Sequence, residues 1–255
     1  MATRTDAPTR REQILKEAAR LFAERGFHGV GVDEIGAAVG ISGPGLYRHF
    51  PGKDAMLAEL LVGISGQLLT GARRRVEEAG AGTPGDGAEG RVPRGADGDA
   101  AGAGARGGGV DGTDGSGARG QGAGGQGAGA PDTDGASGTA AEALLDSLIE
   151  GHIDFALDDR PLITLHDREL DRLRDSDRKL VRQLQRQYVE LWVQALREVY
   201  PTLTEPAARS AVHSVFGLLN STPHLGRAGS LPGRGTTAAL LHRMARGAFG
   251  AAARG

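Results

Sequence analysis

The stretch GISGPGLYRHFPGKDAM, residues 40–56, combines two patterns that conflict in an ordinary packing helix. Residues 43–45 (Gly-Pro-Gly) disfavour helix, whereas Leu46 and Phe50 are spaced like apolar residues on one helix face. Ser42 is a favourable N-cap, and Pro44 is tolerated in a first helical turn, where its missing N–H is not needed. We therefore expect a short helix after Ser42 whose first turn is left open for close contact with a large partner.

Two helices are expected before this segment. Thr9 and Glu12 have the spacing of a capping box, and an apolar face follows at helical spacing, ending at a stop signal in Gly26. A second helix is expected over residues 32–39, and Gly40 ends it. A long helix followed by two short ones joined at residues 40–42 is a helix-turn-helix arrangement.

Periodic apolar residues also predict helices downstream of this segment. We expect helices over residues 53–78, 140–157, 161–170, 176–199 with Ser176 as N-cap, 204–222 and 236–251. No alternating apolar run flanked by hairpin turns occurs, so no sheet is expected. The predicted fold class is all-α.

The composition limits the classes of function. The chain of 255 residues has no cysteine, which excludes disulfides and thiolate catalysis and is compatible with a reducing cytoplasm. No apolar run approaches the roughly 20 residues that span a bilayer, and residues 1–9 lack the apolar core of a signal peptide. We expect a cytoplasmic protein without a membrane partner. The net charge of −2 does not favour nucleic acid, so DNA binding must rest on a local site.

Residues 80–138 differ from the rest of the chain. This segment holds more than half of the 43 glycines, and its only larger apolar residues are Val92 and Val110. Such a composition cannot bury enough surface to offset the entropy of ordering, so we expect a disordered linker inserted in a loop. Its stretch GAGGQGAGA only superficially imitates a phosphate-binding loop, because it lacks a preceding strand and a Lys-Ser/Thr end.

The stretch ILKEAARLFAERGFHGVGVDEIGAAVGISGPGLYRHFPGKDAML, residues 14–57, resembles the TetR-type transcriptional regulators over its whole length. The marks are AA-x-LF-x-x-x-GF, GIS-x-x-x-LY-x-HF and the following Lys-Asp-x-x-Leu. The resemblance implies a three-helix DNA-binding domain over residues 8–68, with its helix-turn-helix at about 31–50. A connecting helix over 53–79 and a larger helical effector-binding and dimerisation domain over 139–255 would complete the chain.

A recognition helix offers its N-terminal residues to base edges in the major groove. We expect Gly43 and Gly45 to allow close approach, Pro44 to press on a thymine methyl, and Arg48 to reach guanine or a phosphate. The family places backbone contacts at Tyr47, His49 and Lys53. The expected DNA-binding set is Arg10, Arg11, Ser42, Gly43, Pro44, Gly45, Tyr47, Arg48, His49 and Lys53. Val30-Gly31 and Gly43 depart from the family, which often has a hydroxyl pair and a lysine at these places.

The C-terminal half resembles the family only in its helix count. The implied effector pocket is expected to be lined by Ile153, Phe155, Leu162, Ile163, Leu165, Tyr188, Leu191, Trp192 and Phe216. This set suggests a small apolar effector, with acyl-CoA or a lipid-related compound as one possibility. Histidines and a carboxylate in this half, at 152, 166, 167, 213 and 224, lack the spacing of a zincin site, so neither a metal nor another cofactor is expected.

Two half-sites on DNA require a dimer. The expected interface is Val212, Val215, Leu219, Leu240, Leu241 and Met244, although these residues also suit an intradomain core. We thus expect a homodimeric, ligand-responsive regulator, taken as a repressor, on a palindromic double-stranded operator, and no enzyme. The alternative is a helix-turn-helix DNA-binding dimer whose C-terminal domain binds a protein partner and no small molecule.

Overall fold

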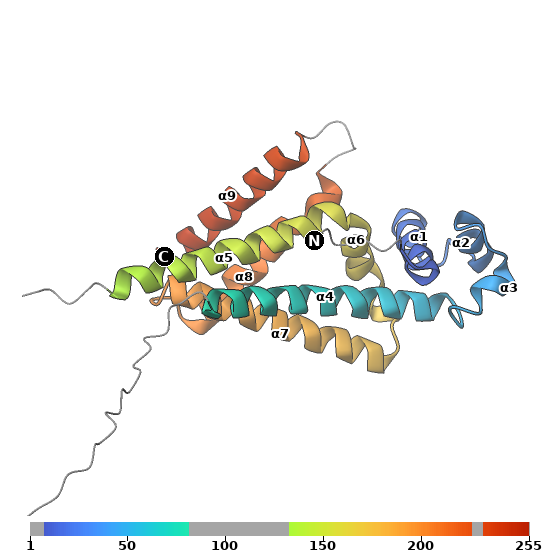
Figure 1. Cartoon of the computed structure of the whole chain (residues 1–255), viewed down its shortest axis with the longest axis horizontal. Helices are drawn as coiled ribbons and strands as arrows, with labels where there is room; N and C mark the ends of the chain where they lie inside the picture. Colours follow the sequence, from blue (N-terminus) through green and yellow to red (C-terminus); the bar gives the residue numbers. More distant parts are fainter. Residues whose placement is uncertain (1–7, 82–132, 226–231, 255) are drawn as a thin grey trace, which may run out of the picture. The chain divides into compact units, whose positions relative to one another are not determined.

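The computed structural model describes residues 8–81, 133–225 and 232–254, and within these ranges every regular element is a helix (Figure 1). The N-terminal helices are α1 (Arg10–Arg25), α2 (Val32–Ala38), α3 (Gly43–Leu46) and α4 (Lys53–Ala81). The C-terminal part contains α5 (Thr133–Asp158), α6 (Arg160–Glu169), the 3-10 turn η1 (Leu170–Arg172), α7 (Asp175–Val199), α8 (Glu205–Leu219), η2 (Thr222–His224) and α9 (Arg234–Ala252). The all-α prediction is confirmed.

Most of the predicted helix boundaries agree with the structure. Thr9 and Glu12 form the expected capping box, in which the Glu12 amide donates to Thr9 Oγ1 over 3.2 Å. Gly26 ends α1 with a φ of 76°. The N-cap prediction at Ser176 is wrong: α7 begins one residue earlier, at Asp175, and its N-cap position is Arg174.

The expected disordered linker, residues 80–138, lies largely outside the described residues. At its two ends, α4 continues to Ala81 and α5 begins at Thr133, so both neighbouring helices are longer than the sequence pattern predicted.

Two apolar cores organise the described part of the chain, and α4 contributes to both. Met56 and Leu57 belong to a core that α4 forms together with α1, α2 and α3, which is the core under α1–α3. Leu69 and Ala72 belong to the C-terminal core, which α4 forms with α5, α7, α8 and α9. By length and composition α4 is the one described helix that could cross a membrane. Its apolar residues are those of a core helix, because they fill these two cores.

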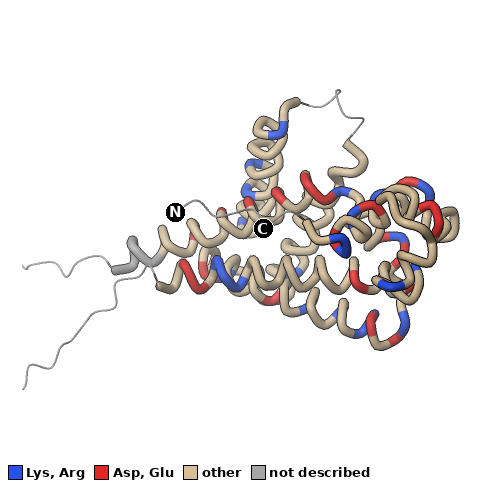
Figure 2. Tube along the Cα trace, turned by 45° about the vertical axis from the view of Figure 1, so that its right-hand side comes forward, with Lys and Arg blue, Asp and Glu red and all other residues tan. Residues whose placement is uncertain are grey.

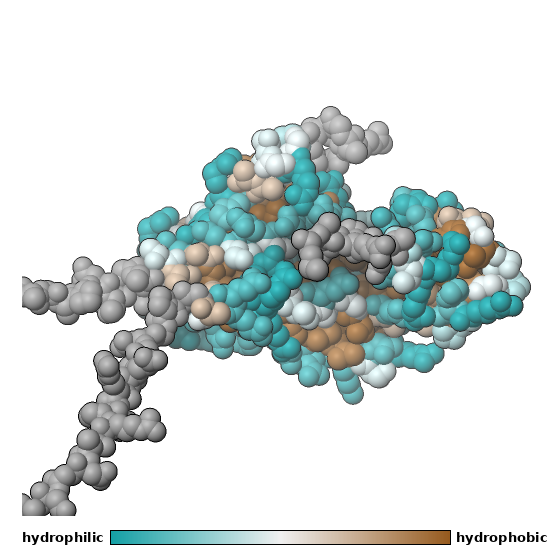
Figure 3. Space-filling view, in the orientation of Figure 1, coloured by the Kyte–Doolittle hydropathy of each residue, from teal (hydrophilic) through white to brown (hydrophobic). Residues whose placement is uncertain are grey.

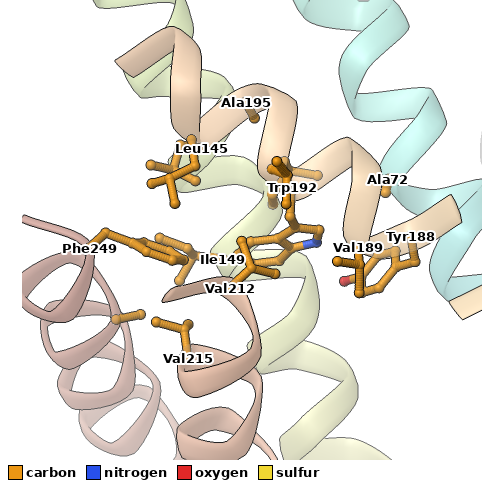
Figure 4. Packing of buried hydrophobic residues seen from close by; sticks show 14 of the residues in the cluster. Ala72, Leu145, Ile149, Tyr188, Val189, Trp192, Ala195, Val212, Val215 and Phe249 are labelled. Carbon is orange, nitrogen blue, oxygen red and sulfur yellow. The ribbon is translucent and has the colours of Figure 1, made fainter. Parts of the chain in front are cut away.

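The C-terminal core is centred on the fully buried Trp192 of α7 (Figure 4). Tyr188 and Val189 lie on one side of the indole and Phe249 of α9 on the other, with ring centroids of Trp192 and Phe249 6.3 Å apart. The core under α1–α3 also takes in Leu165, Leu173 and Val181 from beyond the linker. The two predicted domains therefore share apolar packing.

Candidate DNA-binding surface and effector cavity

The turn between α2 and α3 is built around glycine. Gly40 has a φ of 72°, a conformation that side chains with a Cβ adopt only with strain. The amide of Ile41 then donates to the Gly36 carbonyl over 2.9 Å. Ser42 caps α3 as expected, because its Oγ accepts a hydrogen bond from the Gly45 amide over 3.3 Å.

Helix α3 and the turn that follows it present several of the predicted DNA-binding residues to solvent. Ser42, Pro44 and Arg48 are exposed, and the side chain of Tyr47 is 56% exposed. Gly45 and His49 are half-buried. The backbone amide of Arg48 donates to the Gly45 carbonyl, but its guanidinium has no hydrogen-bond or ion-pair partner among the described residues and is free to bind DNA.

The structure assigns Gly43 a different role from the predicted one. Gly43 is buried, and a Cβ at this position would lie 2.0 Å from Oδ1 of Asp33 in α2. Its missing side chain therefore allows close packing of α2 against α3, and the expectation that it admits DNA is not supported by its position.

The two arginines at the start of α1 form contacts within the N-terminal module, which comprises α1–α3 and the start of α4. Arg10 Nη1 donates to the Val39 carbonyl over 2.9 Å, at the end of α2. Arg11 forms an ion pair with Glu59 of α4, donates to the His49 carbonyl, and stacks over the Phe50 ring at 4.1 Å. Both arginines thus help to position the helix-turn-helix, and the charge of Arg11 is already paired.

Lys53, the first residue of α4, is also partly occupied. Its Nζ donates to the carbonyls of Phe27, over 2.9 Å, and Val30, over 3.1 Å. The ammonium also lies 4.6 Å from the centroid of the Phe27 ring. Because an ammonium has three donors, this arrangement holds the α1–α2 connection and leaves one donor for a phosphate.

Charges of both signs are mixed over this module. Figure 2 shows lysine and arginine positions among aspartate and glutamate positions, without a continuous basic face in that view. Glu34 carries part of the acidic charge, and its pKa is lowered, chiefly because its carboxylate accepts a hydrogen bond from the Gly31 amide. Because acidic residues offset much of the positive charge on this surface, we expect a modest non-specific affinity for DNA.

A cavity of about 280 Å³ lies among α4, α5, α6, α7 and α8. Five of the predicted pocket residues line it: Phe155, Leu162, Ile163, Tyr188 and Phe216. The other four lie elsewhere. Ile153, Leu191 and Trp192 pack in or against the C-terminal core, and Leu165 belongs to the core under α1–α3. The predicted residues lie on helices that line this cavity, but apolar periodicity cannot say which apolar side chains face a hollow.

Sequence reasoning missed the polar half of the cavity lining, which consists of Ser65, His152, His166, Asp167, Gln185, His213 and Asn220. Four of these were weighed only as metal ligands. Within the described ranges no three histidines, aspartates or glutamates gather as a metal site needs, and the exposed His224 lies on η2, away from the cavity lining. A mid-helix histidine between apolar neighbours, as in IEGHIDF, was the available signal.

His152 is the centre of a buried polar network. Its Nδ1 lies 3.0 Å from the Tyr188 hydroxyl and its Nε2 lies 3.0 Å from Oδ1 of Asn220. Because the Asn220 oxygen only accepts, we assign the proton to Nε2, and Nδ1 then accepts from Tyr188. Burial lowers the pKa of His152 to about 4 and raises that of Tyr188. The ring of His152 is neutral at pH 7 and packs against both Tyr188 and Phe216, whose own ring centroids lie 5.4 Å apart.

Helix α6 joins this cavity to the DNA-binding module. Its residues Leu162 and Ile163 line the cavity, and Leu165 is buried in the core under α1–α3, against which Leu162 also packs. At the end of α6 the buried Glu169 accepts a hydrogen bond from the Phe27 amide over 3.3 Å and pairs with Arg172. Neighbouring residues of one helix therefore contact both the cavity and the module.

The predicted dimer residues divide into two groups. Val212, Val215, Leu219 and Leu241 are buried in the core of the single chain. Leu240 and Met244 are each 45% exposed on α9, where Figure 3 shows apolar surface beside polar surface. Only these two of the predicted residues are available to a second copy of the chain.

Comparison with known proteins identifies related chains. A family model described as bacterial regulatory proteins of the tetR family matches residues 14–60, and one described as a tetracyclin repressor-like C-terminal domain matches residues 138–224. The transcriptional activator FasR of Mycolicibacterium smegmatis is 38% identical over 65 residues, which are 26% of this chain and 30% of FasR. The transcriptional repressor KstR2 of Rhodococcus jostii is 41% identical over 71 residues, 28% of this chain and 34% of KstR2.

The chain thus matches about a third of the length of these curated relatives. A crystal structure of a TetR-family transcriptional regulator from Bordetella parapertussis has the same fold, with a TM-score of 0.62, 16% identity, and coverage of 94% of this chain and 95% of that one. The two family models together cover more than half of the sequence. The chain belongs to the TetR family of helix-turn-helix transcriptional regulators.

Proposed function

We propose that this protein binds a palindromic operator as a homodimer and is switched by a small effector held in the cavity among α4–α8. The observation that carries the proposal is the position of α6, which lines the cavity with Leu162 and packs Leu165 and Glu169 against the DNA-binding module. A ligand that prefers one position of α6 would alter the operator affinity of the module.

The DNA contacts are assigned to exposed residues of α3 and of the turn that follows it. Pro44 packs on a thymine methyl, Arg48 reaches a guanine or a phosphate, and Tyr47 and His49 contact the DNA backbone. Lys53 contributes its remaining donor to a phosphate. Arg10 and Arg11 support the module from within, which revises their predicted role as direct contacts.

The dimer is assigned to the exposed face of α8 and α9. Leu240 and Met244 are large apolar side chains on α9, and Gly247 and Ala248, one helical turn beyond Met244, are small and exposed, which permits close helix approach. A dimer built there would present two copies of α3 to one palindrome, as half-sites spaced by helical turns require.

The effector is assigned as a small, largely apolar molecule with polar groups that meet His152 or its neighbours. A cavity of about 280 Å³ approaches the range of small-molecule sites, which are mostly apolar with a few polar anchors. This cavity favours the small-molecule function over the alternative in which the C-terminal part binds only a protein. Acyl-CoA or lipid-related compounds remain one proposed class.

The sign of regulation is proposed to be repression, in which the bound dimer obstructs transcription. The relatives offer both signs, since FasR is described as an activator and KstR2 as a repressor. A reporter gene placed behind the operator tests this: lower expression with the protein present supports repression, and higher expression would contradict it. A cytoplasmic location follows from the proposed access to DNA.

Selection from a library of random duplexes tests the DNA-binding part. The purified protein should enrich an inverted repeat, and Arg48→Ala should bind the selected sequence more weakly by about 1–3 kcal/mol if its guanidinium reads a base. Arg74→Gln is a matched control, because Arg74 pairs with Glu78 on the exposed surface of α4. If no sequence is enriched by the wild-type protein, the proposed function is wrong.

A further inference from the structure

A second, smaller cavity adjoins the first and contains an arginine. Arg75 of α4 lines this space of about 170 Å³, together with Gly71 and Gly151. Ile64, Leu68, Phe155 and Tyr188 line both cavities. One elongated molecule would therefore extend from Arg75 past Phe155 and Tyr188 into the larger hollow.

Within the described parts of the chain, the charge of Arg75 has no counter-ion. The side chain is partly buried, and its Nη1 donates to the Gly71 carbonyl over 3.2 Å. None of the ion pairs formed by the described residues includes it. Its neighbours differ: Arg73 bonds Gln187 over 3.0 Å, and Arg74 lies 3.6 Å from Glu78. A guanidinium that lines a cavity without an anion favours an anionic ligand group.

A helix-interior glycine makes room for this guanidinium. A Cβ at Gly151 in α5 would lie 2.5 Å from both Cζ and Nη2 of Arg75. Glycine in the middle of a helix is less favourable than alanine. Glycine at position 151 lets the Arg75 guanidinium pack against the backbone of α5. The planar donor group is thereby placed at the cavity.

One carboxylate in the smaller cavity would repel an anionic ligand. Asp159 also lines the smaller cavity, but no ion pair joins it to Arg75. Burial raises the pKa of Asp159, and the nearby charge of Asp158 raises it further, whereas Lys16 lowers it. Removing this carboxylate offers an independent test of the charge preference.

We infer that Arg75 binds the anionic end, a carboxylate or a phosphate, of an effector whose apolar body occupies the larger cavity. This inference rests on the proposed effector site and adds the charge and orientation of the ligand. Planar guanidinium binds either anion through two parallel hydrogen bonds. A neutral apolar molecule of the same length would leave Arg75 without a counter-ion.

Isothermal titration calorimetry with three probes of one chain length tests the inference. Octanoate carries a carboxylate, octyl phosphate carries a phosphate, and 1-octanol is neutral. At least one anion should bind the full-length wild-type protein roughly tenfold more tightly than 1-octanol, the worth of a charge-assisted hydrogen bond. The more tightly bound anion identifies the headgroup.

Variants locate the preference. Arg75→Gln should reduce the preference for the anionic probe over 1-octanol to within about twofold, whereas the control Arg74→Gln should retain that preference. Gly151→Ala should also reduce it by displacing the guanidinium, without lowering the melting temperature, because alanine favours helix. Asp159→Asn should strengthen it. If all three probes bind the wild type equally, if none binds, or if the preference survives both Arg75→Gln and Gly151→Ala, the inference is wrong.

The result of this titration is independent of the result of the DNA selection that tests the proposed function. Enrichment of a DNA sequence in the absence of any probe depends on α3, and anion preference depends on Arg75. A protein that selects an inverted repeat but binds the three probes equally would retain the proposed function and lose the inference. A protein that prefers an anion but selects no DNA would do the reverse.

Discussion

The backbone amide of Phe27 donates a hydrogen bond to Oε1 of Glu169 over 3.3 Å, across 142 positions of sequence. Phe27 follows the glycine that ends α1, and Glu169 is the last residue of α6. The carboxylate is buried and also pairs with Arg172. The connection between α1 and α2 is therefore bonded to the helix that lines the effector cavity, and the same connection is held from α4 by Lys53.

Glu169→Ala should weaken this connection. The substitution leaves the buried Phe27 amide without an acceptor, which costs about 1–3 kcal/mol of unfolding free energy. Glu169→Gln retains an oxygen acceptor and should lose less. Urea denaturation measures both, with Asp171→Ala as a control because the Asp171 carboxylate is 87% exposed. Equal stability of Glu169→Ala and the control would contradict the assigned bond.

Lys53→Met should lower the stability of the DNA-binding module. It removes two hydrogen bonds from a charged donor to the carbonyls of Phe27 and Val30, and bonds of this kind contribute about 1.5–3 kcal/mol each. Lys16→Met, at an exposed position of α1, is the matched control. Thermal unfolding compares the two. A Lys53→Met protein as stable as the control would leave only the phosphate contact as a role for Lys53.

His152 should make the protein less stable in acid. Its pKa is about 4 in the fold, because burial disfavours the charged ring, and about 6.5 in the unfolded chain. As the pH falls from about 6.5 to about 4, the unfolded state binds a proton that the folded state does not. This linkage lowers the free energy of unfolding by roughly 3 kcal/mol over that window.

His152→Phe removes this titration but retains a ring that packs against Tyr188 and Phe216. The variant should be less stable than the wild type near pH 7, because Tyr188 and Asn220 lose a partner, and the difference should shrink near pH 4.5. Urea denaturation at the two pH values tests this. An unchanged difference would show that His152 is not held neutral by the fold.

Leu240→Glu combined with Met244→Glu should dissociate the dimer. Both side chains are 45% exposed in the single chain, so the charges would face a second copy without disturbing the core. Leu180→Glu is the control, because Leu180 is 41% exposed on α7. Sedimentation velocity should show monomers for the double variant and dimers for the control. A monomeric wild-type protein, or a double variant that stays dimeric, would contradict the assigned interface.

The sequence was sufficient for the all-helical fold and for the cap of α3, because those features depend on local signals. Thr9, Gly26, Gly40 and Ser42 each specify a helix end or a turn through their own backbone or side-chain chemistry. Apolar periodicity separates buried from exposed faces, but it cannot separate a residue that fills a core from one that borders a cavity. Leu165 and Ile163 illustrate this, since they lie two positions apart on α6, yet Leu165 belongs to the core under α1–α3 and Ile163 borders the cavity.

Contacts between distant segments could not be read from the sequence. Gly43 was expected to face DNA, yet its environment is set by Asp33, ten positions earlier. Lys53 and Arg11 have the charge of DNA-binding residues, yet their nearest acceptors are Phe27, Val30 and Glu59. Each of these roles depends on tertiary packing, for which a single sequence gives no local pattern.

The central claim is that occupancy of the cavity controls operator affinity, and a cavity-filling variant tests it without a ligand. Ser65 is buried and lines the cavity, and its hydroxyl donates to the Leu61 carbonyl of its own helix, so Ser65→Phe would place a ring in the space beside α6. The measurement is fluorescence anisotropy on the selected operator, with the exposed Thr202→Phe as control. We predict a change in operator affinity of at least about fivefold for Ser65→Phe and none for the control, within the usual range of allosteric coupling. A folded Ser65→Phe protein that binds the operator as the wild type does would contradict the account.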